Sequence, residues 1–472
     1  MAVLKFGTSG WRGIIAADFT FANARLVCQG IAEYLKQAGN TSQGVIIGYD
    51  TRFLSEDFAA LAAEIMAGNG IPSFLGVRTI PTPVVTFAIL AGRHAGGITV
   101  TASHNPGEYN GIKFSPAWGG PAPSAVTKVI ENHIRHLQDD QVQWLPLTEA
   151  RQQGLVHDLD PREAYLQDLA TKIDVSVIRR AGLKIVVDPL YGTAVGYLDR
   201  FLIEAGVEVN LLHDWRDPYF GGQKPEPTAD ALAELSQEVQ ASQAHLGLAV
   251  DPDADRFGVV DHQGQYHPAN LILALLLDYL VKTRGWRQGV ARSVATSHLI
   301  DRVAAYHGLP VYETKVGFKH LAAYLLDGRA AMIGEEADGF TMRGHLPEKD
   351  GMLAGLLITE MIARTGKNLP QLRDELFALV GPLYTRRLDL RLSVDAQARL
   401  LERLAQTPAS LAGRSVVQHV TLEGHKFILD DGSWVCLRPS GTEPVVRVYL
   451  EAGTPADLER LHQATATLLE KV

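Results

Sequence analysis

Short apolar segments of strand type alternate with amphipathic helical segments along most of this chain. The first example is a helical pattern at 23–37, an apolar strand at 45–50 and a second helical pattern at 56–66. Such alternation predicts α/β domains with mixed, largely parallel sheets. In these sheets a ligand crevice forms at the carboxyl ends of the strands. The residues that follow each strand are therefore the first place to look for chemistry.

The length and two changes of pattern predict four domains. A chain of 472 residues is too long for one hydrophobic core. Residues 138–160 are polar and irregular, which indicates a linker, an edge hairpin or a long surface loop, and 366–383 form a second boundary. After residue 388 strands, a hairpin signal at 430–433 and a terminal helix at 455–469 indicate an α+β domain. The predicted domains are 1–150, 151–259, 260–372 and 373–472.

A serine motif follows one of the predicted strands. The strand at 95–100 leads into Thr101-Ala102-Ser103-His104-Asn105-Pro106, and Lys113 lies ten residues beyond Ser103. A serine hydroxyl is a poor nucleophile unless a base, a metal or positive charge activates it. His104 and Lys113 are candidates for that role. The alternative is a polar turn at a strand exit, because Ser, Asn, Pro and Gly are common turn residues.

Three aspartates follow another strand, in the segment Asp251-Pro252-Asp253-Ala254-Asp255-Arg256. Carboxylates at alternate positions can converge on one hard cation, and Mg²⁺ suits a site that leaves a position for a phosphate oxygen. An EF-hand loop is rejected, since it needs glycine at Arg256 and glutamate at His262. A solvated acidic turn is the other alternative, and the apolar segments on both sides argue against it.

Several loops carry polar side chains that suit a sugar phosphate. Arg12 lies in the glycine-rich segment 7–13, where backbone N–H groups and a guanidinium can hold an anion, although an ordinary turn also fits. Glu335 ends a strand and can bind sugar hydroxyls. Lys319 fits a cleft or a solvated helix start, and Lys349 normally would be a surface lysine. A phosphate clamp near the C-terminus would use Arg438, Ser440, Gly441, Thr442 and Arg447.

Composition excludes some classes of function. The net charge is −9, with 44 Lys and Arg against 53 Asp and Glu, which argues against a nucleic-acid or acidic-membrane binder. Two cysteines, Cys28 and Cys436, imply neither disulfides nor a cysteine metal site, and Cys28 is predicted to be a buried thiol. No signal peptide or apolar run long enough for a membrane is evident. We expect a cytoplasmic protein.

These motifs, in this order, resemble the α-D-phosphohexomutase (phosphoglucomutase/phosphomannomutase) family. The resemblance extends from the glycine-rich segment at 7–10 to Arg438-Pro439-Ser440-Gly441-Thr442-Glu443-Pro444 and so covers essentially the whole chain. It implies three related α/β domains and a smaller C-terminal α+β domain around a central cleft. It also implies that Ser103 carries a phosphoryl group. The implied Mg²⁺ ligands are Asp251, Asp253, Asp255 and the oxygen on Ser103.

The implied activity is interconversion of hexose 1-phosphate and hexose 6-phosphate, with glucose and/or mannose as the sugar. A hexose 1,6-bisphosphate would be the intermediate and activator. Glu335 would read the sugar, and the clamp around Arg438 would hold the phosphate that is not transferred. Lys349 and His104 are the acid/base candidates, followed by Lys113, while Arg256 and Lys113 can assist the transfer.

Two departures from the family pattern affect these expectations. Pro252 replaces a common glycine, with little expected consequence because the three carboxylates remain. Ala337 replaces a common serine of the sugar-reading loop, which leaves the preferred sugar open. Two other functions therefore stay open: a glucose 1,6-bisphosphate synthase that releases the bisphosphate, and a non-catalytic sugar-phosphate sensor. The expected partners are small sugar phosphates, with a monomer or a homodimer as the assembly.

Overall fold

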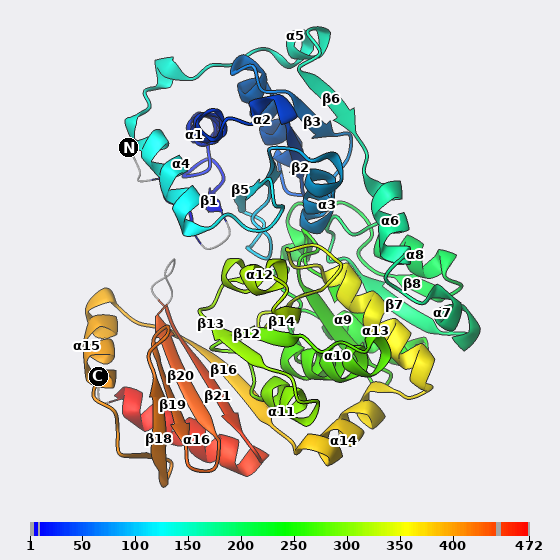
Figure 1. Ribbon diagram of the computed structural model, residues 1–472, viewed down its shortest axis with the longest axis vertical. Helices are drawn as coiled ribbons and strands as arrows, with labels where there is room; N and C mark the ends of the chain where they lie inside the picture. The colour runs from blue at the N-terminus through cyan, green and yellow to red at the C-terminus, as the bar shows by residue number, and fades with distance from the viewer. Residues whose placement is uncertain (1–3, 8–9, 440–444, 471–472) are drawn as a thin grey trace. The chain divides into compact units, whose positions relative to one another are not determined.

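The computed structural model describes residues 4–7, 10–439 and 445–470, which form two compact units (Figure 1). The first unit comprises Met1–Pro268 and Ala337–Leu369, and the second comprises Ala269–Glu336 and Pro370–Val472. Among the described residues, no helix combines the length and the apolar character needed to cross a membrane.

The first sheet of the first unit has six strands in the order β1-β5-β4-β2-β3-β6. β2, β3, β4 and β6 are parallel, whereas β5 is antiparallel to β4 and β1 is antiparallel to β5. The strands are β1 (Trp11–Ile14), β2 (Val45–Tyr49), β3 (Ser73–Gly76), β4 (Gly96–Val100), β5 (Tyr109–Pro116) and β6 (Val156–Leu159). The helices in the same part of the chain are α1 (Phe21–Ala38), α2 (Ser55–Gly68), α3 (Thr82–Gly92), α4 (Ser124–His136) and α5 (Leu147–Gln152).

The polar segment 138–160 is more regular than its composition predicts. It contains α5 and ends in β6, which pairs with β3 at the edge of the sheet. Only Val156 of β6 is buried, while His157 and Asp158 are exposed. An edge strand needs few apolar residues, and its polar sequence therefore resembles that of a linker.

The second sheet of the first unit has the order β11-β10-β9-β7-β8. β7 is parallel to β8 and β9, while β9 and β10 form an antiparallel hairpin. The strands are β7 (Lys184–Asp188), β8 (Glu208–Leu211), β9 (Leu246–Val250), β10 (Phe257–Asp261) and β11 (Tyr266–His267). The other elements of the unit are α6 (Arg162–Ala170), α7 (Val175–Ala181), α8 (Leu198–Glu204), α9 (Ala233–Ala241), β15 (Gly339–Met342) and α13 (Gly351–Thr365). α13 contacts both strands of the β9–β10 hairpin.

The second unit begins with parallel strands in the order β13-β12-β14. Its last sheet is wholly antiparallel, in the order β16-β21-β20-β19-β18-β17, as expected of the α+β segment. The first group of elements is α10 (Ala269–Arg284), β12 (Gly289–Ser293), α11 (Leu299–Tyr306), β13 (Val311–Thr314), α12 (Phe318–Leu326), β14 (Ala330–Glu335) and α14 (Leu369–Val380). The second is β16 (Tyr384–Arg391), α15 (Val394–Leu404), β17 (Ser410–Leu411), β18 (Arg414–Val420), β19 (His425–Leu429), β20 (Trp434–Pro439), β21 (Val445–Ala452) and α16 (Pro455–Glu470).

The predicted fold class is confirmed: α/β segments with mixed, largely parallel sheets precede a C-terminal α+β sheet. The β2 residues Val45, Ile46 and Ile47 are all fully buried, as a strand covered on both faces requires. The hairpin predicted at 430–433 joins β19 to β20. Both cysteines are buried and unpaired, and burial raises the pKa of each thiol to about 12. The domain borders and the central cleft remain predictions.

Candidate active site

The serine motif forms the connection between two antiparallel strands, β4 and β5. Ser103 is 2% exposed and has a φ of 52°, in the left-handed region that costs free energy for a residue with a Cβ. The Ser103 backbone N–H donates to Thr101 Oγ1 over 2.9 Å. A Cβ on Gly111 would lie 2.6 Å from Thr101 O, so the loop approaches β5 at a distance that glycine permits. The loop is therefore tightly built and holds its serine in a strained conformation.

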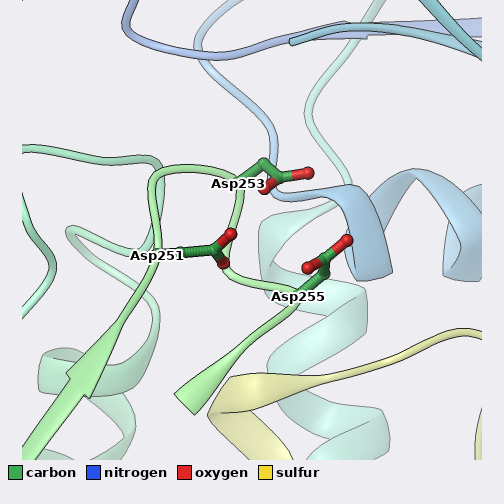
Figure 2. A group of neighbouring side chains, drawn as sticks. All are labelled: Asp251, Asp253 and Asp255. Atoms are coloured by element: carbon green, nitrogen blue, oxygen red, sulfur yellow. The ribbon is translucent and has the colours of Figure 1, made fainter. Parts of the chain in front are cut away.

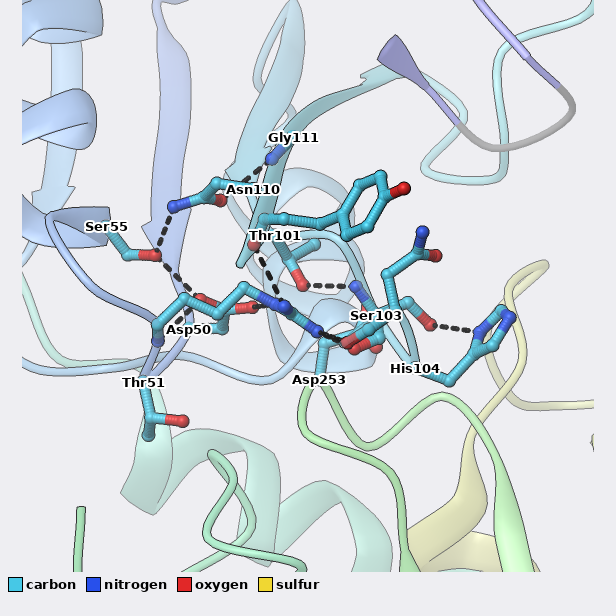
Figure 3. Close-up of polar contacts among 12 residues, drawn as sticks. Asp50, Thr51, Ser55, Thr101, Ser103, His104, Asn110, Gly111 and Asp253 are labelled. Atoms are coloured by element: carbon cyan, nitrogen blue, oxygen red, sulfur yellow. Dashed lines mark hydrogen bonds and ion pairs between the residues drawn. The ribbon is translucent and has the colours of Figure 1, made fainter. Parts of the chain in front are cut away.

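Arg52, which follows β2, holds this loop through its main-chain carbonyl groups. The guanidinium donates to the oxygens of Ser103 and Asn105 over 2.5 Å each, and to those of Pro106 and Tyr109 over 2.6 and 2.9 Å. Its Nε donates to Asp50 over 3.1 Å, and its side chain is fully buried. Ser55 Oγ donates to the same Asp50 carboxylate over 2.7 Å, as a dashed line in Figure 3 shows. Five donors in a fixed plane suit an arginine to this role.

The three aspartates lie on the connection between β9 and β10 (Figure 2). One oxygen from each of Asp251, Asp253 and Asp255 lies within 4.8 Å of the others, and all three residues are buried. Ala254 within the loop has a φ of 58°, which bends the chain so that alternate side chains gather on one side. The predicted convergence of the carboxylates is thus present, and the solvated acidic turn is excluded.

The serine and the aspartates meet directly. Ser103 Oγ donates to Asp251 Oδ2 over 2.9 Å, although 148 positions separate the two residues. Lys113 on β5 donates to Asp253 over 2.5 Å and to Asp255 over 3.1 Å. Lys349, just before α13, lies 3.2 Å from Asp255 and donates to Glu348 over 2.9 Å. Lys349 is 9% exposed, so it is buried and is not the surface lysine that its sequence context would normally indicate.

The electrostatics of the cluster reflect burial and like charge. Burial, followed by the charges of Asp253 and Asp255, raises the pKa of Asp251 well above its usual value. Burial also acts to raise the pKa of Asp253, but the charge and hydrogen bond of Lys113 outweigh it, so this pKa is lowered. Burial opposes the charge of Lys113, yet Asp253 and Asp255 raise its pKa overall. Lys113 is therefore a persistent cation.

Three more predicted residues border the serine. His104 Nδ1 lies 3.3 Å from Ser103 Oγ. Burial and then the charges of Arg256 and Arg12 lower the pKa of His104 well below its usual value, so its ring is neutral at neutral pH. Arg12 donates to Asn105 Oδ1 over 2.6 Å. Arg256 donates from its backbone to Asp251 and from its guanidinium to Glu226, each over 3.0 Å.

Comparisons with known proteins agree with this site. The four domain models described as phosphoglucomutase/phosphomannomutase alpha/beta/alpha domains I, II and III and C-terminal domain match residues 3–141, 163–264, 268–380 and 397–468. The chain is 32% identical to a phosphoglucomutase of Komagataeibacter xylinus, over 95% of this chain and 87% of the relative. The chain belongs to the phosphoglucomutase/phosphomannomutase family. It is accordingly an enzyme of this type, a phosphotransferase that moves phosphate within a sugar.

Two further relatives of this family enter the comparison. A protein of Methanothermobacter thermautotrophicus assigned as a phosphoglucosamine mutase is 30% identical, over 99% of this chain and 98% of that one. The crystal structure of a Thermus thermophilus protein assigned as a phosphomannomutase has a TM-score of 0.86 and 32% identity, and the match covers 99% of each chain. The fold is therefore shared with family members that carry different substrate names.

The residues present fit the divalent cation that this family implies. Asp253 Oδ1 and Asp255 Oδ1 are buried, and neither has a hydrogen-bond partner in the described part of the chain. A buried carboxylate oxygen without a partner carries a substantial desolvation cost. Hard oxygen atoms on three converging carboxylates are the donor set that Mg²⁺ prefers. A cation held by Asp251, Asp253 and Asp255 would satisfy the two unpaired oxygens.

The residues predicted to bind the sugar and the phosphate that is not transferred lie in the second unit. Glu335, at the end of β14, accepts from the Gly317 backbone over 2.7 Å. Arg438, on β20, donates to Glu423 over 2.7 Å, and Glu423 also accepts from the Val316 backbone over 2.6 Å. Glu335 therefore contacts Gly317, and Arg438 is connected to the neighbouring Val316 through Glu423, all within this unit. Lys319 and Arg447 also belong to it, whereas Ser440, Gly441 and Thr442 lie outside the described residues.

Sequence reasoning missed Arg52 as a functional residue, although it placed Asp50, Thr51 and Arg52 at a strand end. The signal was the sequence Asp-Thr-Arg directly after a buried strand, where a ligand crevice is expected. Arg52 contacts the serine loop through carbonyl oxygens, and such contacts leave no pattern in the sequence of that loop. Its role as a positioning residue depends on the pairing of β2 with β4.

Proposed function

We propose that this enzyme interconverts hexose 1-phosphate and hexose 6-phosphate, with glucose and/or mannose as the sugar, through a phosphorylated Ser103 and a hexose 1,6-bisphosphate. The contact of Ser103 Oγ with Asp251, at the edge of three converging carboxylates, is the observation that supports it most strongly. Phosphoryl transfer requires mainly positioning and charge stabilisation. A strained, buried serine among fixed cations and cation ligands supplies both.

In the proposed reaction the phosphoryl group leaves Ser103 Oγ and joins the free hydroxyl of a hexose monophosphate. The bond between phosphorus and Oγ breaks, a bond to the sugar oxygen forms, and the proton of the sugar hydroxyl passes through a base to Ser103 Oγ, which is released as a hydroxyl. The bisphosphate then turns around and returns its other phosphoryl group to Ser103. Mg²⁺, when bound by the three aspartates, would neutralise charge on the phosphoryl oxygens.

The surrounding side chains include candidates for the base that accepts the hydroxyl proton and for the cations that stabilise the charge of the phosphoryl group. His104 is neutral and adjacent to Ser103 Oγ, so it can accept a proton. Lys113 keeps its proton because its pKa is raised, and it suits charge stabilisation better than base catalysis. Lys349 is the other acid/base candidate, since it is buried beside Asp255. Arg12 and Arg256 add fixed positive charge around the same loop.

The second unit carries the residues proposed for recognition of the sugar and of the resting phosphate. Glu335 would accept hydroxyl groups, and Arg438 would bind phosphate, with Lys319 and Arg447 in support. Arg438 Nη1 is buried and has no hydrogen-bond partner among the described residues, which fits an anion that the chain itself does not supply. The segment Tyr109-Asn110-Gly111 resembles the glucose and mannose branches of the family more than the glucosamine branch, and for this reason we propose glucose or mannose as the sugar.

The test is a Ser103→Ala variant assayed for exchange of glucose 1-phosphate and glucose 6-phosphate with Mg²⁺. Turnover should be lost, together with the mass of one phosphoryl group on the protein. Ser73→Ala is a matched control, because Ser73 is also buried and its hydroxyl makes no hydrogen bond with the described residues. Turnover by Ser103→Ala at the rate of the wild type would refute the role of this serine.

Ala337 is the observation that favours a second candidate, a hexose 1,6-bisphosphate synthase. It lies in the turn between β14 and β15, directly after the proposed sugar-reading residues. A weaker hold on the sugar would release the bisphosphate before it turns around. Phosphorus NMR of the products separates the two: net accumulation of hexose 1,6-bisphosphate indicates the synthase, and exchange of the monophosphates indicates the mutase. Binding without any phosphoserine or turnover would indicate a sensor.

A further inference from the structure

The first unit contains a cavity of about 420 Å³ that none of the catalytic candidates lines. Its wall comes from the ends of β2 and β3, the turn after β7, the start of α6 and the loop after β8. Tyr49, Arg78, Arg162, Tyr191 and Trp215 are among its lining residues. Sites for small molecules commonly have volumes of roughly 300–1,000 Å³. The cavity is therefore of the size that a phosphorylated metabolite needs.

The charge of the wall favours an anion. Three arginines, Arg78, Arg162 and Arg216, line the cavity against two acids, Glu56 and Asp214. Arg216 is paired with Glu56 over 2.6 Å, and Arg78 is paired with Asp160 over 2.9 Å.

Arg162 is less completely matched. Its Nε is buried and makes no hydrogen bond with any described residue, and the carboxylate of Glu163 lies 3.9 Å away.

Two neutral polar groups on the same wall also lack partners. Thr51 Oγ1 and Tyr197 Oη are buried and have no hydrogen-bond partner among the residues that the structure describes. Both residues line the cavity and are at least nine-tenths buried, with exposures of 5% and 1%. Buried polar groups are seldom left unmatched in a folded protein. Three such atoms around one cavity indicate that its occupant is polar.

An aromatic surface forms another part of the wall. Trp215 is 58% exposed, which is high for the largest apolar side chain. The Tyr191 ring packs edge-on against Trp215 with 5.2 Å between the ring centroids, and it also contacts His213 at 4.4 Å. The position of the Trp215 ring is thus supported from one side. Rings of ligands stack on surfaces of this kind.

We propose that this cavity binds a phosphate monoester of a ring compound, with the phosphate at Arg162 and the ring on Trp215. A guanidinium group binds phosphate through paired N–H donors, and Arg78 reinforces the positive field. The ester is either a nucleotide, whose base would stack on the indole of Trp215, or a hexose phosphate, whose sugar ring would do so. The site is separate from the proposed catalytic one and does not depend on it.

The wall of the cavity is connected to the serine loop through Arg216 and Arg52. Arg216, on the cavity wall, donates to the main-chain oxygens of Thr51 and Arg52 over 3.1 Å each. Arg52 in turn holds the oxygens of Ser103 and Asn105. A ligand beside Thr51 therefore lies one residue from the side chain that holds the loop.

The test is isothermal titration calorimetry of the full chain with AMP, glucose 6-phosphate and inorganic phosphate as separate probes. Arg162→Gln should weaken binding of at least one ester by a factor of ten or more, and Trp215→Ala by a factor of about five. Arg151→Gln is the matched control, because Arg151 is an exposed, paired arginine outside the cavity, and it should change binding less than twofold. Binding of glucose 6-phosphate at the catalytic site should be unchanged by all three substitutions.

The probes distinguish the sources of the ester. Sensitivity of AMP binding to both substitutions identifies a nucleotide, and sensitivity of glucose 6-phosphate identifies a sugar phosphate. Because Trp215 is exposed, its alanine variant should fold even if Arg162→Gln does not. The proposal would be overturned if neither ester shows a binding step, besides that of the substrate at the catalytic site, that Trp215→Ala weakens, or if the affinity of that step matches that of inorganic phosphate. The absence of any binding that depends on Arg162 would also overturn it.

Discussion

Two clusters of charged side chains, one in each unit, differ in how completely their atoms are matched. In the first unit three aspartates share two lysines, and two carboxylate oxygens have no partner in the described chain. In the second unit Arg292 pairs with Asp301 and with Glu313 over 2.5 Å each. Lys426, with no exposed surface, donates to Glu313, to the Val294 carbonyl oxygen and to His298.

This difference distinguishes a functional site from a network that stabilises the fold. In the second cluster opposite charges are matched, and it ties β12, β13 and α11 to β19. In the first cluster like charges are held together at a cost, beside a serine with positive φ. Unmatched buried groups of this kind persist when a ligand or a reaction requires them. Each of the following changes tests that contrast.

The largest effect is expected from breaking the matched network. Lys426→Met should lower the free energy of unfolding by about 3–5 kcal/mol, since it removes a fully buried cation that donates to Glu313, to the Val294 carbonyl oxygen and to His298. Urea unfolding measures it. Lys282→Met, at an exposed i,i+4 pair with Asp278, should cost less than about 1 kcal/mol. Equal losses in the two variants would show that the network is not buried in solution.

A substitution in the unmatched aspartate cluster should lower turnover much more than stability. Asp251→Asn removes a charge that burial and two neighbouring carboxylates oppose, so the stability measured with EDTA should not fall. Turnover should fall by about 10²–10³-fold, the loss typical of one removed electrostatic contact in a reaction site. Thermal unfolding and mutase assays on the same preparation check both. A stability loss as large as that of Lys426→Met would make this cluster structural.

A smaller effect is expected at the residue that holds the serine loop. Arg52→Lys retains the charge but loses the planar fork that reaches four carbonyl oxygens, so kcat should fall by about tenfold or more with less change in KM. Arg216→Lys is the control, since it alters two carbonyl contacts at an exposed position. An unchanged kcat in Arg52→Lys would show that Ser103 needs no such support.

The smallest effect is a pH dependence in the matched network. Burial, then Lys426 and Arg292, lowers the pKa of His298 to about 2. An unfolded histidine binds its proton near pH 6.5, so the unfolded state gains protons that the folded state does not. Stability is therefore lost as pH falls below about 6.5. His298→Gln should make that slope shallower by up to about 1.4 kcal/mol per pH unit.

His213 supplies the comparison of opposite sign. Its hydrogen bond to Asp188 is the main cause that raises its pKa, so its contribution is present below the unfolded pKa and is lost as pH rises through the folded pKa. His213→Gln should therefore remove stability on the acid side, where His298→Gln restores it. Urea midpoints measured between pH 5 and pH 8 decide the signs. The same slope in both variants would contradict the assignment of His298 as a buried neutral ring.

Patterns along the sequence were sufficient to predict most helices and strands and to identify each motif by itself. Ser103 and the three aspartates could be selected because they follow apolar strands, whereas Lys349 has the pattern of a surface lysine and was selected only through the resemblance to the family. The edge strand β6 could not be recognised, because an exposed strand has the polar composition of a linker. The residues at 440–442, which carry part of the predicted clamp, lie outside the described chain.

The sequence by itself determined the alternation of strands and helices and the chemistry available at each strand end, because both depend on neighbours along the chain. Tertiary structure alone decided that Asp251 contacts Ser103, that Lys113 and Lys349 contact the neighbouring aspartates, and that Arg52 holds the serine loop. Those contacts depend on strand register and on helix packing between segments more than 50 positions apart. It also decided which carboxylate oxygens remain unmatched, because that depends on every atom packed around them.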